Sequence, residues 1–165
     1  MLALIAVAAI VCSQVESPAE HIQEIGYKLA PGRAEKIGRL IEHWSKKYDV
    51  EPEILTAILR QESNFESGIK ACWIVHRYRT CQITCDYGIA QINELWIKKW
   101  GLDPDRLQND DSYGIRIAAR LLAILKREYG HEENWWGRYH SATPSKRSAY
   151  EERLHGFIAY ATGSK

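Results

Sequence analysis

Glu62 is the residue of this chain that is best suited to acid–base chemistry. It closes an apolar segment in which Leu55, Ile58 and Leu59 recur with it at three- and four-residue spacing, so the four share one helix face. An ionised carboxylate on an apolar face is costly, and this cost raises its pKa so that it holds a proton near neutral pH. A general acid needs this property. The alternative is a helix-terminal Glu whose carboxylate turns into water.

A second polar cluster follows in the segment Gly88-Ile89-Ala90-Gln91-Ile92-Asn93. Gly88 permits a close backbone approach, and the amide of Gln91 offers both a donor and an acceptor to a ligand. Asn93 is a possible outlying contact. In the alternative interpretation, Gln91 caps or bridges two helices.

A partner for Glu62 is harder to find. Enzymes that use a carboxylic acid as general acid often pair it with a second carboxylate that acts as base or nucleophile. Asp86, Glu66 and Glu94 are the nearest acidic residues in the sequence, and none of them lies in a motif that supports the role.

The elements that must position these residues are helices. Apolar spacing predicts helices over Arg33–Tyr48, Pro52–Asn64, Ile89–Trp100 and Asp111–Tyr129, and a last helix that begins at Pro144. Residues 68–87 have no clean period and contain three Cys, which predicts a loop-rich insert with at most a small hairpin. We recognise no convincing run of period-two alternation, so we expect an all-α, small helical domain with a Cys-containing loop insert.

Size and charge narrow the class of protein. A chain of 165 residues is long enough for one domain with a proper core. Its 22 basic and 21 acidic residues give a net charge of +1, which leaves no electrostatic footprint for nucleic acid. No nucleotide-binding loop, flavin fingerprint or metalloprotease pattern occurs, and we expect no cofactor and no metal.

The N-terminal residues bear on the compartment. Leu2 to Val11 form an apolar run of signal-peptide length, too short to span a membrane, although no Lys or Arg precedes Lys28. We expect residues 1–13 to be a signal peptide, 14–32 a linker and 33–162 the domain, and the protein to be periplasmic. The alternative is a short N-terminal helix that remains on the protein.

The insert carries Cys72, Cys81 and Cys85. In an exported protein we expect one disulfide, from Cys72 to either Cys81 or Cys85. The three thiols together with His76 are the alternative, a Cys₃His zinc set, but the tight Cys-x-x-Cys spacing of such sites is missing.

Taken in order, three motifs resemble the lytic transglycosylase domain, whose fold is like that of goose-type lysozyme and which cuts peptidoglycan. These are Glu62-Ser63 after an apolar helix, the Gly88–Ile92 segment, and Tyr139-His140-Ser141 before a last helix. The resemblance covers about residues 34–161. The tyrosine motif is most similar to that of the specialised transglycosylases of secretion and conjugation machines, and some phage enzymes look similar.

The resemblance implies a role for each motif residue. Glu62 would be the single catalytic acid and base, with Tyr139 orienting it and Ser63 helping to hold its carboxylate; the alternative for Ser63 is a bond back to a helix carbonyl. The remaining motif residues would line the sugar groove: Gly88, Ile89, Gln91, Asn93 and His140. Ala90 and His140 depart from the family's usual Met and Asn. A lone His is more often structural than catalytic.

Three functions remain open at this stage. The resemblance implies a monomeric lytic transglycosylase whose partner is peptidoglycan, together with a possible secretion, conjugation or phage apparatus. A hydrolytic muramidase would need a second carboxylate, with Asp86 as the first to test. The third function is a non-catalytic scaffold component that binds the wall.

Overall fold

The computed structural model describes residues 18, 22, 29–77 and 80–161. The predicted signal peptide lies outside these residues, as does most of the predicted linker, and the domain boundaries stay a prediction. Ile22 is described and is fully buried in the core. None of the helices in the described part of the chain is long and apolar enough to cross a membrane.

Helices make up most of the fold. They are α2 (Pro31–Tyr48), α3 (Pro52–Ser63), α4 (Glu94–Trp100), α5 (Pro104–Asn109), α6 (Asp111–Tyr129), the 3₁₀ helix η1 (Trp135–Tyr139) and α7 (Pro144–Ala161). The predicted all-α, lysozyme-like class is confirmed in that helices dominate the fold, with one small three-stranded sheet beside them. Proline opens α2, α3 and α5, where its missing N–H costs no hydrogen bond.

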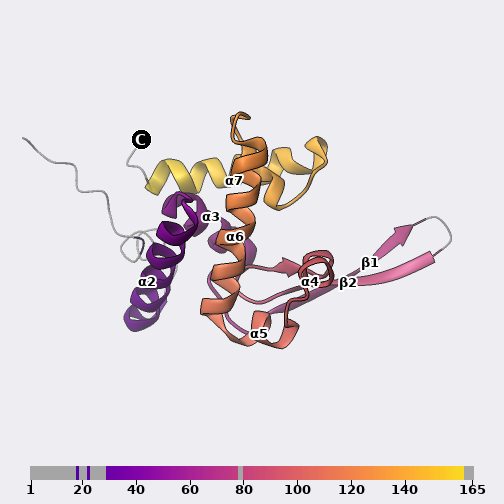
Figure 1. The fold of residues 1–165 in the computed structure, drawn as a ribbon, viewed down its shortest axis with the longest axis horizontal. Coiled ribbons are helices and arrows are strands. Elements are labelled where there is room, and N and C mark those ends of the chain that lie inside the picture. The colour runs from indigo at the N-terminus through magenta and orange to yellow at the C-terminus, as the bar shows by residue number, and fades with distance from the viewer. Residues whose placement is uncertain (1–17, 19–21, 23–28, 78–79, 162–165) are drawn as a thin grey trace, which may run out of the picture.

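The core lies around α6, which contacts α2, α3, α5 and η1 (Figure 1). The side chain of Asp110 caps α6 by accepting a hydrogen bond from the backbone N–H of Tyr113. Ile115, Ala118 and Leu122 of α6 are fully buried. Packing of these helices holds α3, and with it Glu62, in the middle of the molecule.

The insert is more regular than the sequence predicts. Strands β1 (Lys70–Arg77) and β2 (Thr80–Tyr87) pair antiparallel, and β2 also pairs with the short β3 (Ile92–Asn93). β1 and β2 project from the helical body as an arm (Figure 1). Residues 80–87 do alternate polar and apolar side chains, a strand signal that the prediction from sequence overlooked, whereas β1 carries apolar residues on both faces and shows no such alternation.

A disulfide joins Cys72 and Cys85, which face each other across the arm. One of the two predicted pairings is therefore confirmed. The zinc alternative loses two of its thiols to this bond. Cys81 is exposed and lies opposite His76 in the register.

The segment before α4 also differs from expectation. The predicted helix over Ile89–Trp100 begins five residues later, at Glu94, because Gly88 and Gln91 take positive φ values of 71° and 45° and form a turn. The side chain of Asn93 then caps α4 by accepting a hydrogen bond from the N–H of Leu95.

Candidate active site

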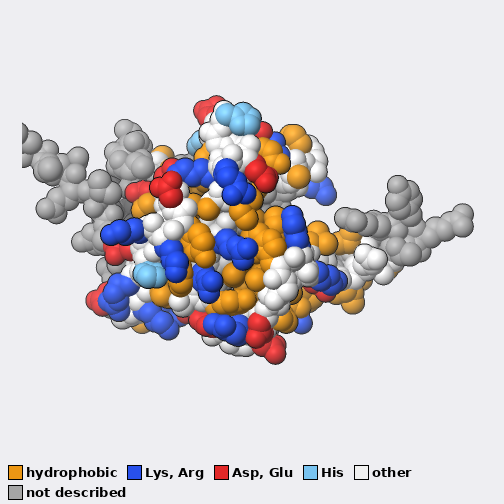
Figure 2. All heavy atoms as spheres, in the orientation of Figure 1, with side chains coloured by type: hydrophobic (Ala, Val, Ile, Leu, Met, Phe, Trp, Pro, Cys, Tyr) orange, Lys and Arg blue, Asp and Glu red, His pale blue; other side chains and the backbone are white. Residues whose placement is uncertain are grey.

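A cleft of about 640 Å³ lies where the arm meets the helices, and Glu62 is in its wall. Its lining comes from α3, both strands of the arm, β3, α4, α6 and η1. The polar and charged lining residues include Asp86, Gln91, Asn93, Lys99, Glu128, Arg138 and His140. On the face drawn in Figure 2, hydrophobic side chains gather over α6 and α4, with Lys and Arg side chains among them.

Glu62 comes from the last turn of α3 and is half-buried. Burial raises the pKa of its carboxyl group from the ordinary 4.5 to about 7, and the nearby charge of Asp86 also raises it. The hydrogen bond from Tyr150 and the charge of Arg153 act in the opposite direction but are outweighed. The carboxyl group is therefore about half protonated at neutral pH, as a group that both gives and takes a proton must be.

The hydroxyl of Tyr150, on α7, donates a hydrogen bond to Oε1 of Glu62 at 2.7 Å. Tyr150 is almost fully buried, and the imidazole of His140 stacks flat on its ring, with centroids 4.6 Å apart and an interplanar angle of 8°. Burial and the neighbouring Glu62 carboxylate raise the pKa of Tyr150, so its hydroxyl stays a donor. Tyr150 thus fixes the orientation of the acid, and His140 restrains Tyr150.

The sequence prediction gave this orienting role to Tyr139, but the direct hydrogen bond comes from Tyr150. Tyr139 also lines the cleft, and its hydroxyl donates instead to the backbone carbonyl of Ala90 at 2.8 Å. Tyr139 therefore ties η1 to the turn that follows Gly88. Tyr150 falls within the last helix predicted from the sequence, but no role at the acid was predicted for it. Its separation of 88 residues from Glu62 hid the contact.

Asp86 is a second acidic residue in the cleft wall, at the end of β2. It accepts a hydrogen bond from the side-chain amide of Asn93, which lies opposite it in the β2–β3 register. Burial raises its pKa from the ordinary 3.8 to about 6, and the bond from Asn93 offsets part of that rise. Asp86 therefore carries a negative charge at neutral pH and helps Glu62 to hold its proton.

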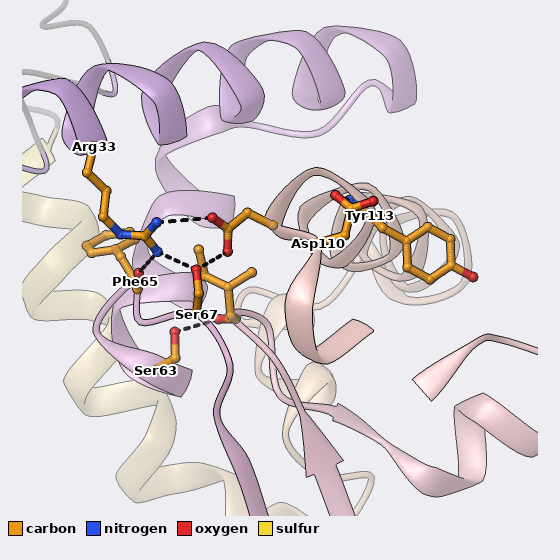
Figure 3. Close-up of polar contacts among 8 residues, drawn as sticks. Arg33, Ser63, Phe65, Ser67, Asp110 and Tyr113 are labelled. Carbon is orange, nitrogen blue, oxygen red and sulfur yellow. Dashed lines mark hydrogen bonds and ion pairs between the residues drawn. The ribbon is translucent and has the colours of Figure 1, made fainter. Parts of the chain in front are cut away.

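Ser63 does not touch the carboxylate of Glu62. Its hydroxyl donates to the backbone carbonyl of Ile89 at 2.6 Å (Figure 3). The same hydroxyl lies 3.3 Å from the backbone carbonyl of Leu59. The predicted contact with the acid is thus replaced by a tie between the end of α3 and the Gly88 turn. The alternative interpretation, a bond back to a helix carbonyl, describes the weaker of the two contacts.

The chain leaves α3 through two residues with positive φ, Asn64 at 53° and Phe65 at 62°. Arg33 of α2 secures this exit. Its guanidinium donates to the carbonyl of Phe65 at 2.6 Å and to the Ser67 hydroxyl at 2.8 Å, and it pairs with Asp111 at 3.1 Å (Figure 3). The cluster joins α2, α6 and the start of the arm, and so sets where the arm leaves the body.

Part of the Gly88 segment packs against the body of the protein, and only part of it lines the cleft. A Cβ on Gly88 would lie 1.8 Å from the carbonyl oxygen of Leu107, so the close approach made possible by this glycine is to α5. Gln91 lines the cleft, and its Nε2 donates to the Gly88 carbonyl at 2.8 Å. Ile89 is only 1% exposed and does not line the cleft, so the predicted contact of its side chain with the sugar groove is absent.

Of the predicted site residues, the structure brings Glu62, Tyr139, Gln91, Asn93 and His140 into one cleft. Ser63, Gly88 and Ile89 lie behind its wall and support it. Tyr150, which supports the acid directly, was missed. The described residues contain no cluster of His, Cys, Asp and Glu that would hold a metal ion.

Comparison with known proteins gives one family model and several curated relatives that match the chain. The family model described as the transglycosylase SLT domain matches residues 39–163. Among curated proteins, the chain is similar to the invasion protein IagB of Salmonella typhimurium, strains SL1344 and LT2, and to that of Salmonella typhi. The identity is 30% over 111 residues in each case, which covers 66% of this chain and 65% of the relative. The chain thus spans slightly less than two thirds of the length of these relatives.

Proposed function

The chain belongs to the transglycosylase SLT domain family, and we propose that it cleaves the β-1,4 bond between N-acetylmuramic acid and N-acetylglucosamine in peptidoglycan. The product in this proposal carries a 1,6-anhydromuramic end. The observation that carries the proposal is the carboxyl group of Glu62, which lies in an open cleft, has a pKa of about 7 and is oriented by the hydroxyl of Tyr150.

The first step is general acid catalysis. Glu62 gives its proton to the glycosidic oxygen as the bond from that oxygen to the anomeric carbon breaks. The N-acetylglucosamine portion leaves with a 4-hydroxyl group, and positive charge develops at the anomeric carbon of the muramic acid. The Glu62 carboxylate, now ionised, stabilises this charge, and the Asp86 carboxylate adds to the negative field of the cleft.

The second step regenerates the acid. The 6-hydroxyl oxygen of the same muramic acid attacks its anomeric carbon, and the proton of that hydroxyl returns to Glu62. No water is consumed, and Glu62 ends in the protonated form in which it began. One carboxyl group with a pKa near 7 serves both steps, because neither of its protonation states is strongly disfavoured at neutral pH.

Asp86 supports a second candidate, a hydrolytic muramidase. It shares the cleft with Glu62 and is ionised at neutral pH, as a base or nucleophile requires. In that reaction water replaces the 6-hydroxyl group and leaves a reducing muramic end. The third candidate is a wall-binding scaffold without turnover. The raised pKa of Glu62 argues against it, because a binding protein gains nothing from a buried acid.

We further propose that the enzyme acts as a monomer in the periplasm and opens the wall locally for a secretion, conjugation or phage apparatus. The Cys72–Cys85 disulfide supports an oxidising compartment. The relatives are named invasion proteins, which supports a role in invasion, and the apparatus itself is inferred from the resemblance of the Tyr139-His140-Ser141 motif. The N-terminal signal peptide remains a prediction from the sequence.

The test is mass spectrometry of the fragments released from purified sacculi by the protein and by two variants, Glu62→Gln and Asp86→Asn. We expect anhydromuramic ends from the parent, none from Glu62→Gln, and the same ends at reduced yield from Asp86→Asn. Reducing ends that are lost in Asp86→Asn would identify the hydrolase. Binding to sacculi with no release by the parent would identify the scaffold.

A further inference from the structure

Trp73 of β1 lines the same cleft as Glu62, and 44% of its surface is exposed. Within the described residues, its indole forms no hydrogen bond and makes no contact with another ring or a cation. The cleft's other tryptophan, Trp96, is engaged: its ring lies 4.8 Å from that of Trp100, and the ammonium of Lys99 lies 4.8 Å from its centroid. Trp73 therefore offers an open aromatic surface to whatever occupies the cleft.

The register of the arm places Trp73 relative to the acids. Trp73 lies opposite Thr84, and Ala71 lies opposite Asp86. Residues that face each other across an antiparallel pair share a face, as do residues two apart on one strand. Trp73 is therefore on the same face as Asp86, two strand positions, or about 7 Å, further out along the arm.

The other face of the arm has a different character. It carries the Cys72–Cys85 disulfide and the exposed pair Ile74 and Ile83, which lie opposite each other in the register. Neither isoleucine lines the cleft. The disulfide is next to Trp73 in the chain and joins the two strands beside it, so it restrains the position of the indole before any ligand binds.

We propose that Trp73 stacks on a pyranose ring of the glycan strand, outside the two sugars joined by the scissile bond, and makes the enzyme select strands longer than a disaccharide. The proposal rests on the function proposed above, from which it takes the class of ligand. The C–H face of a pyranose is apolar and fits an indole ring, while the indole N–H donates to a sugar hydroxyl or acetamido oxygen. Because Trp73 lies further out along the arm than Asp86, the sugar that it contacts is a neighbour of the two sugars joined by the scissile bond.

The test measures affinity rather than turnover. All proteins in this test carry Glu62→Gln, and the parent is the protein with that change alone. The disaccharide and the hexasaccharide of β-1,4-linked N-acetylglucosamine are titrated calorimetrically into this parent and into the same protein with Trp73→Ala or Trp73→Phe added. We expect Trp73→Ala to weaken hexasaccharide binding about tenfold, or about 1.4 kcal/mol, and to leave disaccharide binding unchanged. Trp73→Phe should recover most of the affinity because it retains an aromatic ring.

Ile74→Ala is the matched control, since Ile74 is the next residue on the same strand, is 60% exposed and faces away from the cleft. It should leave both affinities unchanged. Equal hexasaccharide affinity in Trp73→Ala, or an equal loss for both oligomers, would overturn the proposal, as would binding of neither oligomer by the parent. The two proposals can fail separately. If hexasaccharide affinity depends on Trp73 but the protein with Glu62 intact releases nothing from sacculi, the subsite is supported and only the enzymatic function is refuted.

Discussion

Replacing Glu62 by Gln should make the protein more stable at alkaline pH while abolishing its activity. The carboxyl group has a pKa of about 7 in the folded protein and an ordinary value of 4.5. Between these two values the unfolded chain releases the proton and the folded protein keeps it, so the folded state binds more protons and its stability falls as the pH rises. Below pH 4.5 both states are protonated, and the group contributes no difference.

The size of the effect follows from the two pKa values. Each pKa unit corresponds to 1.36 kcal/mol, so ionisation of Glu62 costs the folded protein up to about 3 kcal/mol once the pH exceeds 7. Gln has the same shape and does not ionise, and its carbonyl oxygen still accepts a hydrogen bond from Tyr150. Glu62→Gln should therefore match the parent at pH 4.5 and exceed its free energy of unfolding by about 3 kcal/mol at pH 8.5.

Urea unfolding followed by tryptophan fluorescence at a series of pH values measures this difference. Glu128→Gln is the control, because Glu128 also lines the cleft but is exposed to water. Its free energy of unfolding should follow that of the parent at every pH. A constant difference between Glu62→Gln and the parent from pH 4.5 to 8.5 would refute the reasoning, since it would mean that folding does not change the proton affinity of Glu62.

Three further predictions concern the supports of the site. The value of kcat/KM should fall above pH 7 as Glu62 ionises. Tyr150→Phe removes a hydrogen bond that lowers the pKa of Glu62, so this decrease in kcat/KM should occur at higher pH in that variant. Tyr139→Phe should leave the pH of the decrease unchanged, because the Tyr139 hydroxyl bonds to a backbone carbonyl instead. Gly88→Ala should destabilise the protein by more than about 3 kcal/mol in urea unfolding, because its Cβ would meet a backbone carbonyl of α5 at 1.8 Å and its φ is +71°. Cys72→Ser should speed amide hydrogen exchange in the arm, with slow helix exchange unchanged; equal exchange in both proteins would show that the disulfide does not restrain the arm.

The sequence was most informative where the signal is local. The spacing of Leu55, Ile58 and Leu59 with Glu62 was enough to place the carboxylate at the end of a buried helix, because helical periodicity depends on nearby residues alone. The helix over Asp111–Tyr129 agrees with the structure for the same reason. The motif order was enough to indicate the family.

Contacts between distant segments were not predictable in this way. The spacing of Ser63, for example, could not reveal that its hydroxyl bonds to Ile89, because that contact depends on how α3 packs against the turn. The assignment of the orienting hydroxyl to Tyr139 rather than Tyr150 has a similar origin. The two tyrosines are close in the sequence and both lie near Glu62, and only the packing of α7 decides which of them reaches it.

The Gly88 turn has a consequence for how this family should be searched. Gly88 is required by its contact with α5, and Ser63 serves as a strut to the same turn. Gly88 and Ser63 would still be needed for the fold in a relative that had no acidic residue at the position of Glu62. A relative could thus retain most of the recognisable motif and be a pseudoenzyme. The positions that distinguish active enzymes from such pseudoenzymes are Glu62 and Tyr150. Tyr150 lies outside the three motifs.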